Sequence, residues 1–393
     1  MRRKLKVAAL LAALVVGPAG VVAVAKARTS HPTVGPKGLK FYSPSKVPSG
    51  PHGTLIWERP MTRGESLKGA KNYLVDYEQI GVHGAIVPVS GMVAIPTGTV
   101  PKGGWPVITW AHGTTGIADL CAPSRLPAGT GGLNIPMLES WIKAGYAVVR
   151  TDYEGLGGPG PHPYLIGTSE GRGVLDIVRA ARQLDPHLSD RVVISGHSQG
   201  GHAALWAASL VKRYTPEIKL RGVLAFAPAS HIATEAALLK SVTTTSLTGL
   251  AATILRGLDV AYPSLHVSSL LTTQAAALYP QTLTRCLGAL DEPDSFGGLP
   301  LDQLLKPKAD TSAAINDLER NDPGDLKIGA PLLLEQGSSD TTVLPLFTAA
   351  LDKSLAGIGD TVTEHTYPGA THGTVLTAAR SDQAACLKRR FGR

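Results

Sequence analysis

Residues 191–212 read RVVISGHSQGGHAALWAASLVK, and this stretch decides the fold. Residues 191–195 are a short β-branched run typical of a buried strand, and residues 199–212 are typical of a helix. Between them lies the pattern Gly-x-Ser-x-Gly, with Ser198 at its centre. A strand that passes into a helix through this turn forms a nucleophile elbow, because the tight turn lifts the serine hydroxyl above the sheet edge. Ser198 is therefore the predicted nucleophile.

The same pattern occurs a second time around Ser169, where residues 167–171 read GTSEG. The preceding residues 157–163 read GGPGPHP, which is a turn-rich sequence and not a strand. Because an elbow needs an incoming strand, we interpret Ser169 as a helix-capping serine.

The rest of the chain supports an α/β fold with a mostly parallel central sheet. Three early runs at residues 53–58, 73–79 and 85–95 predict an antiparallel start to the sheet. Later apolar runs alternate with helical segments such as 170–184, which indicates parallel βαβ units. These later runs lie at residues 106–110, 146–150, 191–195, 222–226, 331–335 and 362–367.

The interval between Pro228 and Gly329 breaks this alternation. It has no convincing strand pattern, only apolar stretches at helical spacing at residues 232–239, 247–258 and 275–286. We therefore expect a helical cap, or lid, at residues 230–328, inserted between core segments 28–229 and 329–393.

A serine nucleophile needs a histidine base and an acid to orient it, and in this fold both follow the serine in the chain. Asp340 lies on a loop just past the strand at residues 331–335, and Glu335 at the end of that strand is the competing acid. His372 lies in the loop after residues 362–367, whereas His365 lies within that strand. Loops at the carboxyl edge of a sheet carry function, so we predict Asp340 and His372.

Two backbone amides should stabilise the oxyanion. One is predicted at Gln199, directly after the nucleophile, and the other at Thr114, with Thr115 as the alternative. His112 and His197 flank these positions but precede Ser198, so we interpret them as residues that shape the loops.

The net charge of +8 does not indicate a nucleic-acid partner. Five of the positive charges lie in the first 27 residues, which contain no acid, so the rest of the chain carries +3. Residues 1–27 have a basic start, an apolar run and an Ala-Lys-Ala end, which predicts a signal peptide for export. The alternative is an uncleaved segment that anchors the protein at the membrane or cell surface.

Five motifs give the chain a family resemblance. It resembles the secretory lipase family of the Candida antarctica lipase A type, with its actinobacterial relatives, through residues 110–116 (WAHGTTG), 121–124 (CAPS), 151–157 (TDYEGLG), 159–164 (PGPHPY) and 196–201 (GHSQGG). The resemblance implies an α/β-hydrolase core, a helical lid after the sixth strand, and hydrolysis of carboxylic esters, often acylglycerols.

The chain has three cysteines, of which two can pair in an exported protein. We prefer the pair Cys121 and Cys286, and the resemblance implies the same bond between Cys121 and a lid cysteine. Cys386 then has no assigned partner.

These patterns predict a secreted serine esterase or lipase that needs no cofactor and no metal. Its expected partner is an ester or a lipid, met at a lipid–water interface if the cap opens there. An acyltransferase or thioesterase with the same triad is the alternative, and a non-catalytic binding protein is a third reading. Acyl chain length and oligomeric state stay open.

Overall fold

The computed structural model describes residues 32–45, 47, 50–62, 64–127, 134–239 and 243–392. The predicted signal peptide at residues 1–27 lies outside these ranges. Among the helices described, none combines the length and the apolar character needed to cross a membrane.

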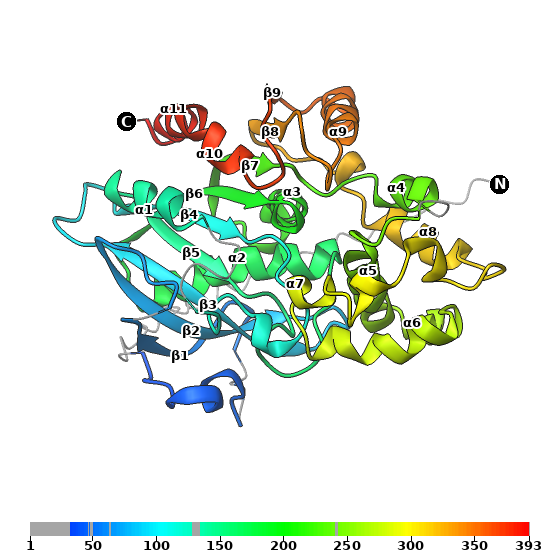
Figure 1. Cartoon of the computed structure of the whole chain (residues 1–393). Coiled ribbons are helices and arrows are strands. Elements are labelled where there is room, and N and C mark those ends of the chain that lie inside the picture. Colours follow the sequence, from blue (N-terminus) through cyan, green and yellow to red (C-terminus); the bar gives the residue numbers. More distant parts are fainter. Residues whose placement is uncertain are drawn as a thin grey trace, which may run out of the picture. The chain divides into compact units, whose positions relative to one another are not determined.

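The described strands form one sheet whose order is β1-β2-β3-β5-β4-β6-β7-β8-β9 (Figure 1). Neighbours from β1 to β5 pair antiparallel, and neighbours from β5 to β9 pair parallel. The strands are β1 Leu55–Pro60, β2 Ala70–Ile80, β3 Ile86–Pro96, β4 Trp105–Ala111, β5 Ala147–Thr151, β6 Leu188–His197, β7 Lys219–Phe226, β8 Leu332–Gly337 and β9 Val362–Tyr367.

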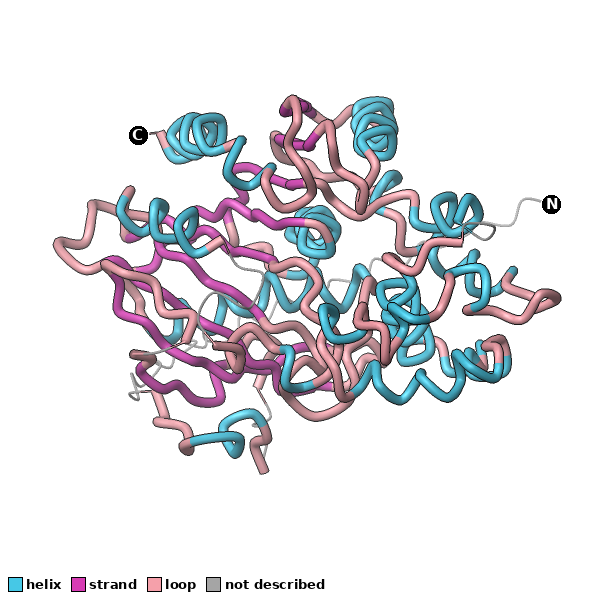
Figure 2. The backbone as a smooth tube through the Cα atoms, in the orientation of Figure 1, coloured by secondary structure: helices cyan, strands magenta, loops and turns pink. Residues whose placement is uncertain are grey.

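Helices bury both faces of the sheet (Figure 2). Along β4, Val107 and Ala111 pack on one side, whereas Ile108 and Trp110 pack on the other. The first side is covered by α2 Gly167–Leu184, α3 Gln199–Tyr214 and α9 Pro345–Gly357, and the second by α1 Ile135–Lys143, α10 Val375–Ala378 and α11 Arg380–Phe391. Because side chains alternate between two covered faces, β4 and β5 are buried along their whole length, whereas the edge strand β9 has polar residues and is partly exposed.

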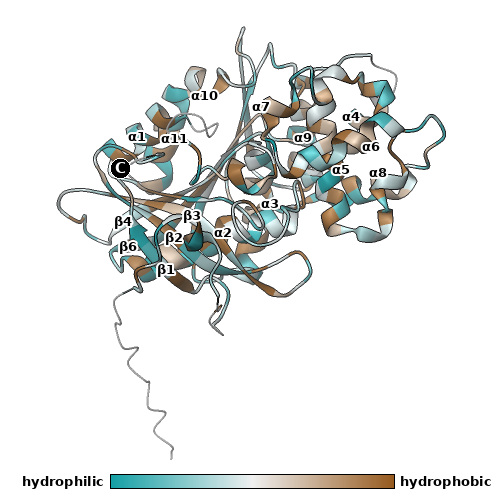
Figure 3. Ribbon diagram, turned by 60° about the horizontal axis from the view of Figure 1, so that its bottom comes forward, coloured by the Kyte–Doolittle hydropathy of each residue, from teal (hydrophilic) through white to brown (hydrophobic). Residues whose placement is uncertain are grey.

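The interval between β7 and β8 is helical, as expected. It contains α4 Ile232–Leu239, α5 Thr248–Ala261, α6 Thr273–Leu278, α7 Leu287–Leu290 and α8 Ser312–Arg320, joined by short 3-10 turns. Figures 1 and 3 show α4, α5, α6 and α8 as one group beside α3. Within this group α5 packs apolar residues such as Ala252 and Leu258 against the other cap segments.

One detail of the predicted cap is wrong. The continuous helix expected at residues 275–286 ends at Leu278 and continues as a 3-10 turn, Tyr279–Leu283. Pro280 explains the break, because its ring removes a helical hydrogen bond and clashes with the preceding turn.

Candidate active site

Ser198 occupies a strained turn between β6 and α3. It is the N-cap of α3, with φ 57° and ψ −120°, a backbone conformation that residues other than glycine rarely adopt. The surrounding chain holds this conformation: the Ser198 amide donates to the Phe226 carbonyl at 2.9 Å, and the Ser198 carbonyl accepts from the Ala229 amide at 3.1 Å. Strain that neighbouring elements maintain is typical of functional sites.

The glycines of the elbow are required by close backbone contacts. A Cβ on Gly196 would lie 2.0 Å from the Gly200 carbonyl oxygen, and a Cβ on Gly200 would lie 2.0 Å from that of Ala111. The helix that follows Ser198 can therefore approach β4 only if these two positions lack side chains.

His372 and Asp340 are directly hydrogen-bonded. The distance between His372 Nδ1 and Asp340 Oδ2 is 2.7 Å, and the Asp340 carboxylate is buried while the imidazole is 20% exposed. Burial alone would raise the pKa of Asp340, but His372 and the amides of Val343 and Thr342 outweigh it and hold that pKa below its usual value. Asp340 is thus an ionised acceptor that fixes the orientation of the His372 ring.

His197 connects this pair to the elbow. Its Nε2 donates to the His372 carbonyl at 2.8 Å, and the two rings lie 4.5 Å apart. Burial and the nearby His372 lower the pKa of His197 to about 3, so the ring is neutral. Because His197 directly precedes Ser198, this hydrogen bond holds the loop of His372 next to the elbow. This contact is consistent with a loop-shaping role for His197.

The competing residues have other partners. Glu335 is buried and accepts from the Tyr367 hydroxyl at 3.1 Å, while burial raises its pKa well above the usual range. The His365 Nδ1 faces Asp382 at 3.4 Å from within β9. Neither residue is among the hydrogen-bond partners found for His372 or Asp340 in the described chain.

Ser169 is not a helix cap, which corrects the expectation from sequence. The N-cap of α2 is Ile166, and Ser169 lies in the first turn of that helix, where its buried hydroxyl donates to Glu154. The cap prediction is wrong because the helix begins at Gly167, three residues earlier than the predicted start at residue 170.

The predicted oxyanion amides are close to the elbow. Gln199 is the first residue of α3, where backbone N–H groups have no partner within the helix. On the facing loop, a Cβ on Gly113 would lie 3.6 Å from the Ser198 Cβ, so the residue before Thr114 lies beside Ser198. The Thr114 hydroxyl is hydrogen-bonded to the Tyr164 hydroxyl at 2.5 Å, and Thr115 is buried.

A disulfide joins the loop after Thr114 to the cap. Cys121 is bonded to Cys286, as predicted, and Cys386 is buried with a free thiol. Next to the disulfide, the Leu287 amide donates to the Thr115 carbonyl at 3.0 Å. The predicted oxyanion loop is thus tied to the cap by one covalent bond and one hydrogen bond.

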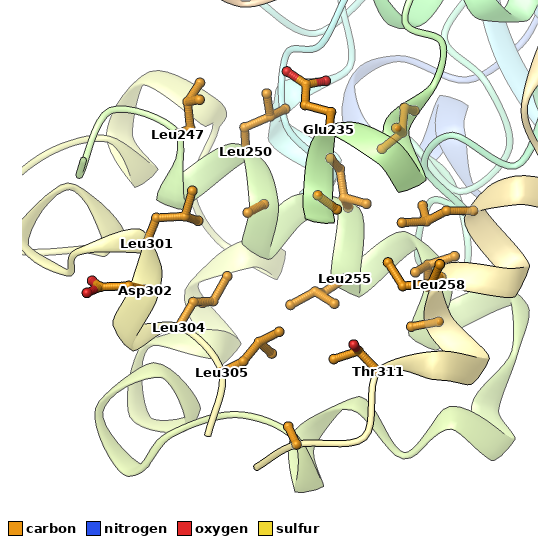
Figure 4. A pocket seen from close by; sticks show the side chains of 18 of the residues that line it. Glu235, Leu247, Leu250, Leu255, Leu258, Leu301, Asp302, Leu304, Leu305 and Thr311 are labelled. Atoms are coloured by element: carbon orange, nitrogen blue, oxygen red, sulfur yellow. The ribbon is translucent and has the colours of Figure 1, made fainter. Parts of the chain in front are cut away.

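An apolar pocket of about 300 Å³ lies within the cap (Figure 4). Leucines of α5 and of residues 301–305 line most of it, including Leu250, Leu255 and Leu304. One of its walls is Thr342, whose amide donates to Asp340 at 2.9 Å. The pocket therefore reaches the loop that carries the predicted catalytic acid.

Glu235 is an acidic side chain of this pocket (Figure 4). Burial and the charge of Asp340 raise the pKa of Glu235 to about 7. In the described part of the chain, no cluster of three or more His, Cys, Asp or Glu side chains could hold a metal ion.

Part of the chain is similar in sequence to known lipases. A family model described as secretory lipase matches residues 122–290. Lipase A of Moesziomyces aphidis is 31% identical over 161 residues, which are 40% of this chain and 32% of that protein. The matched segment is thus about a third of that relative's length.

Solved structures share the fold over most of the chain. Candida antarctica lipase A in its closed state superimposes with a TM-score of 0.76 at 22% identity, covering 89% of this chain and 84% of that one. The rice cell wall degrading esterase LipA from Xanthomonas oryzae gives a TM-score of 0.69 at 20% identity, covering 86% of this chain and 98% of that one. A segment of the chain is similar to the secretory lipases, and its fold is the α/β-hydrolase fold.

Proposed function

We propose that the protein is an exported serine hydrolase that cleaves carboxylic esters, with acylglycerols as the favoured substrates. The observation that carries this proposal is the 2.7 Å hydrogen bond between His372 and Asp340 beside the strained Ser198 turn. Acyl transfer to serine requires a base that takes the serine proton and an acid that orients the base. In the α/β-hydrolase fold the chain order is serine, acid, histidine, which is the order of Ser198, Asp340 and His372. The likeness to secretory lipases supports the same reaction and supports export.

In the proposed mechanism Ser198 attacks the ester carbonyl while His372 accepts the hydroxyl proton. Asp340 fixes the His372 tautomer and stabilises the imidazolium that forms. The amides of Gln199 and Thr114 donate to the oxyanion of the tetrahedral intermediate. His372 then protonates the leaving alcohol, and water releases the acid from the acyl-enzyme by the same steps.

The cap pocket supports a lipid-like acyl group. Its lining is mostly leucine, alanine and isoleucine, and its volume suits an alkyl chain rather than a polar one. Because Thr342 of the acid loop forms part of the pocket wall, an acyl group on Ser198 would pass this loop and extend into the cap. Residues 230–328 would then form the acyl-binding cap.

The first test is hydrolysis of p-nitrophenyl butyrate and palmitate by the wild type and by Ser198→Ala. Ser169→Ala is the matched control, because it removes a hydroxyl from the second Gly-x-Ser-x-Gly copy. The proposal predicts that only Ser198→Ala abolishes activity. Wild-type protein that cleaves neither ester would refute the hydrolase proposal, and acyl transfer to an added alcohol would instead favour the acyltransferase reading.

A second test addresses the acyl pocket. Leu255→Trp should fill the pocket and lower the palmitate-to-butyrate ratio of kcat/KM, whereas butyrate hydrolysis should change little. Leu283→Trp is the control, because Leu283 is an exposed cap residue outside the pocket. An unchanged ratio in Leu255→Trp would mean that the acyl chain binds elsewhere.

A further inference from the structure

Glu170 lies at the centre of a buried polar cluster behind the predicted oxyanion site. We define the cluster as Glu170, His162, Gln199 and His202, whose side chains are all buried. Glu170 Oε1 accepts from Gln199 Nε2 at 2.7 Å, and its Oε2 faces His202 Nδ1 at 3.2 Å. Because Glu170 is not exposed, it does not contact substrate, and its effect must pass through its neighbours.

Both N–H groups of the Gln199 side-chain amide have a hydrogen-bond acceptor within the cluster. His162 Nδ1 faces the Glu154 carbonyl at 2.8 Å, so this nitrogen carries the hydrogen and Nε2 is free to accept. Burial lowers the pKa of His162 to about 4, which keeps the ring neutral. The two N–H groups of Gln199 therefore have two separate acceptors, His162 Nε2 at 3.0 Å and Glu170 Oε1.

His202 anchors the other side of Glu170. Its Nε2 faces the Asn321 carbonyl at 2.8 Å, so this nitrogen must carry a hydrogen. Its Nδ1 faces the Glu170 carboxylate, which is a second acceptor. The hydrogen bond between His202 and Glu170 therefore fixes the carboxyl group in place.

The same carboxylate also supports the second oxyanion residue. Glu170 Oε1 accepts from the Leu165 amide at 2.8 Å, and Leu165 has φ 58°, a strained value for a branched side chain. The preceding residue, Tyr164, bonds the Thr114 hydroxyl. Glu170 thus contacts Gln199 directly and reaches Thr114 through the turn at Tyr164 and Leu165.

We infer that Glu170 is a positioning residue that orients the two oxyanion amides of Gln199 and Thr114. This inference rests on the proposed function, because it assumes that these amides stabilise an oxyanion on Ser198. An amide that is misaligned by a small amount stabilises the transition state less, while it leaves ground-state binding nearly unchanged. The signature is a fall in kcat without a matching rise in KM.

The decisive variant is Glu170→Leu, which removes the acceptors at similar volume. It should lower kcat by about 10- to 100-fold, less than the ~10²–10³-fold loss from deleting an oxyanion donor outright, with KM nearly unchanged. Affinity for an alkyl boronic acid, which forms a tetrahedral adduct with serine, should fall in the same proportion. Glu170→Gln should rescue activity, because its oxygen can accept from Leu165 and Gln199 while its amide donates to His202 Nδ1.

Asp176→Leu is the matched control for folding. Asp176 lies on the same helix, is equally buried, and bonds His52 Nδ1 and the Tyr214 hydroxyl at 2.6 Å each. It should lose stability comparably but keep kcat per folded molecule. If Glu170→Leu does not fold, Gln199→Met tests the same link, because it removes both side-chain donors and leaves the backbone amide.

The outcomes separate this inference from the proposed function. Wild-type activity that Ser198→Ala abolishes supports the hydrolase, whatever Glu170 does. Glu170→Leu with normal kcat, or a loss of kcat as large in Asp176→Leu, would overturn the positioning role. If Glu170→Leu does not fold, a normal kcat in Gln199→Met would equally overturn the positioning role.

Discussion

The two buried acids near the predicted site, Asp340 and Glu335, differ in ionisation because their hydrogen-bond partners differ. Asp340 accepts from His372 and from two backbone amides, which stabilise its charge. Glu335 accepts from one hydroxyl, Tyr367, and its second oxygen has no hydrogen-bond partner among the described residues. Only Asp340 is therefore suited to orient and stabilise a charged histidine.

Asp340→Asn should lower kcat for p-nitrophenyl butyrate by roughly 10⁴-fold, because an amide favours the wrong His372 tautomer. Glu335→Gln is the control and should retain near wild-type kcat. Steady-state kinetics on both variants decides between the acids. If Glu335→Gln is the inactive one, our choice of Asp340 is wrong.

The same two residues give stability opposite dependences on pH. Glu335 stays protonated in the folded protein but ionises in the unfolded chain above its usual pKa of 4.5, because burial raises its folded pKa. Its presence therefore lowers the free energy of unfolding increasingly as pH rises. Glu335→Gln should raise the Tm relative to wild type at about pH 8 and change it little near pH 4.

Asp340→Asn provides the comparison of opposite sign. The folded pKa of Asp340 lies below its usual 3.8, so its stabilising effect is present above that pH and is lost as pH falls through the folded pKa. The wild-type advantage in Tm over Asp340→Asn should thus shrink on acidification. A Tm difference independent of pH in both variants would contradict these assignments.

At the scale of secondary-structure elements, the crossing of α3 over β4 shapes the elbow. The contact is made through backbone atoms, since Gly200 has no side chain to separate the helix from Ala111. The tight turn at Ser198 therefore depends on how two elements pack, as well as on its own residues.

Gly200→Ala should destabilise the fold by about 1–3 kcal/mol and reduce activity, because its Cβ meets backbone that cannot move independently. Gly357→Ala in α9 is the control, since its Cβ would have no neighbour within 4 Å. Chemical denaturation and ester hydrolysis measure both effects. Equal stability of the two variants would show that the α3–β4 contact is looser than described.

Sequence reasoning succeeds where the signal is local to one element. The predicted strand at residues 362–367 coincides with β9, and the predicted α4 range coincides with the helix found. It misses α1 and α9, and it does not give the bounds of α11. In α11 the sequence RSDQAACLKRRF has few apolar residues, so its buried side, with Leu387 and Phe391, gives no clear helical stripe.

The site shows the same limit. Ser198, Asp340 and His372 follow from motifs and chain order, and the structure has the latter two hydrogen-bonded. Glu170 could not be found in this way, because its partners come from the turn at Leu165 and from helix α3, and its role depends on how these segments pack. A glutamate within a helical pattern is normally read as solvent-exposed.

At the scale of the whole molecule, the Cys121–Cys286 disulfide joins two parts that are 165 residues apart in the chain. It connects the loop carrying Thr114 to the cap that contains the apolar pocket. The predicted oxyanion loop and the cap that contains the apolar pocket are therefore linked by this bond and by the Leu287–Thr115 hydrogen bond. Any motion of the cap must leave its segment around Cys286 in place or carry the oxyanion loop with it.

Replacing both cysteines, Cys121→Ser with Cys286→Ser, should therefore lower stability by about 2–4 kcal/mol and also lower kcat. Stability should fall because the unfolded chain gains conformational entropy without the disulfide. The value of kcat should fall because the Thr114 amide is held less firmly. Treatment of the wild type with dithiothreitol should reproduce both effects, whereas the double variant should not respond to it. A response in the double variant would assign the redox effect to Cys386, and a stability loss with unchanged kcat would mean that the disulfide holds the cap without positioning the oxyanion loop.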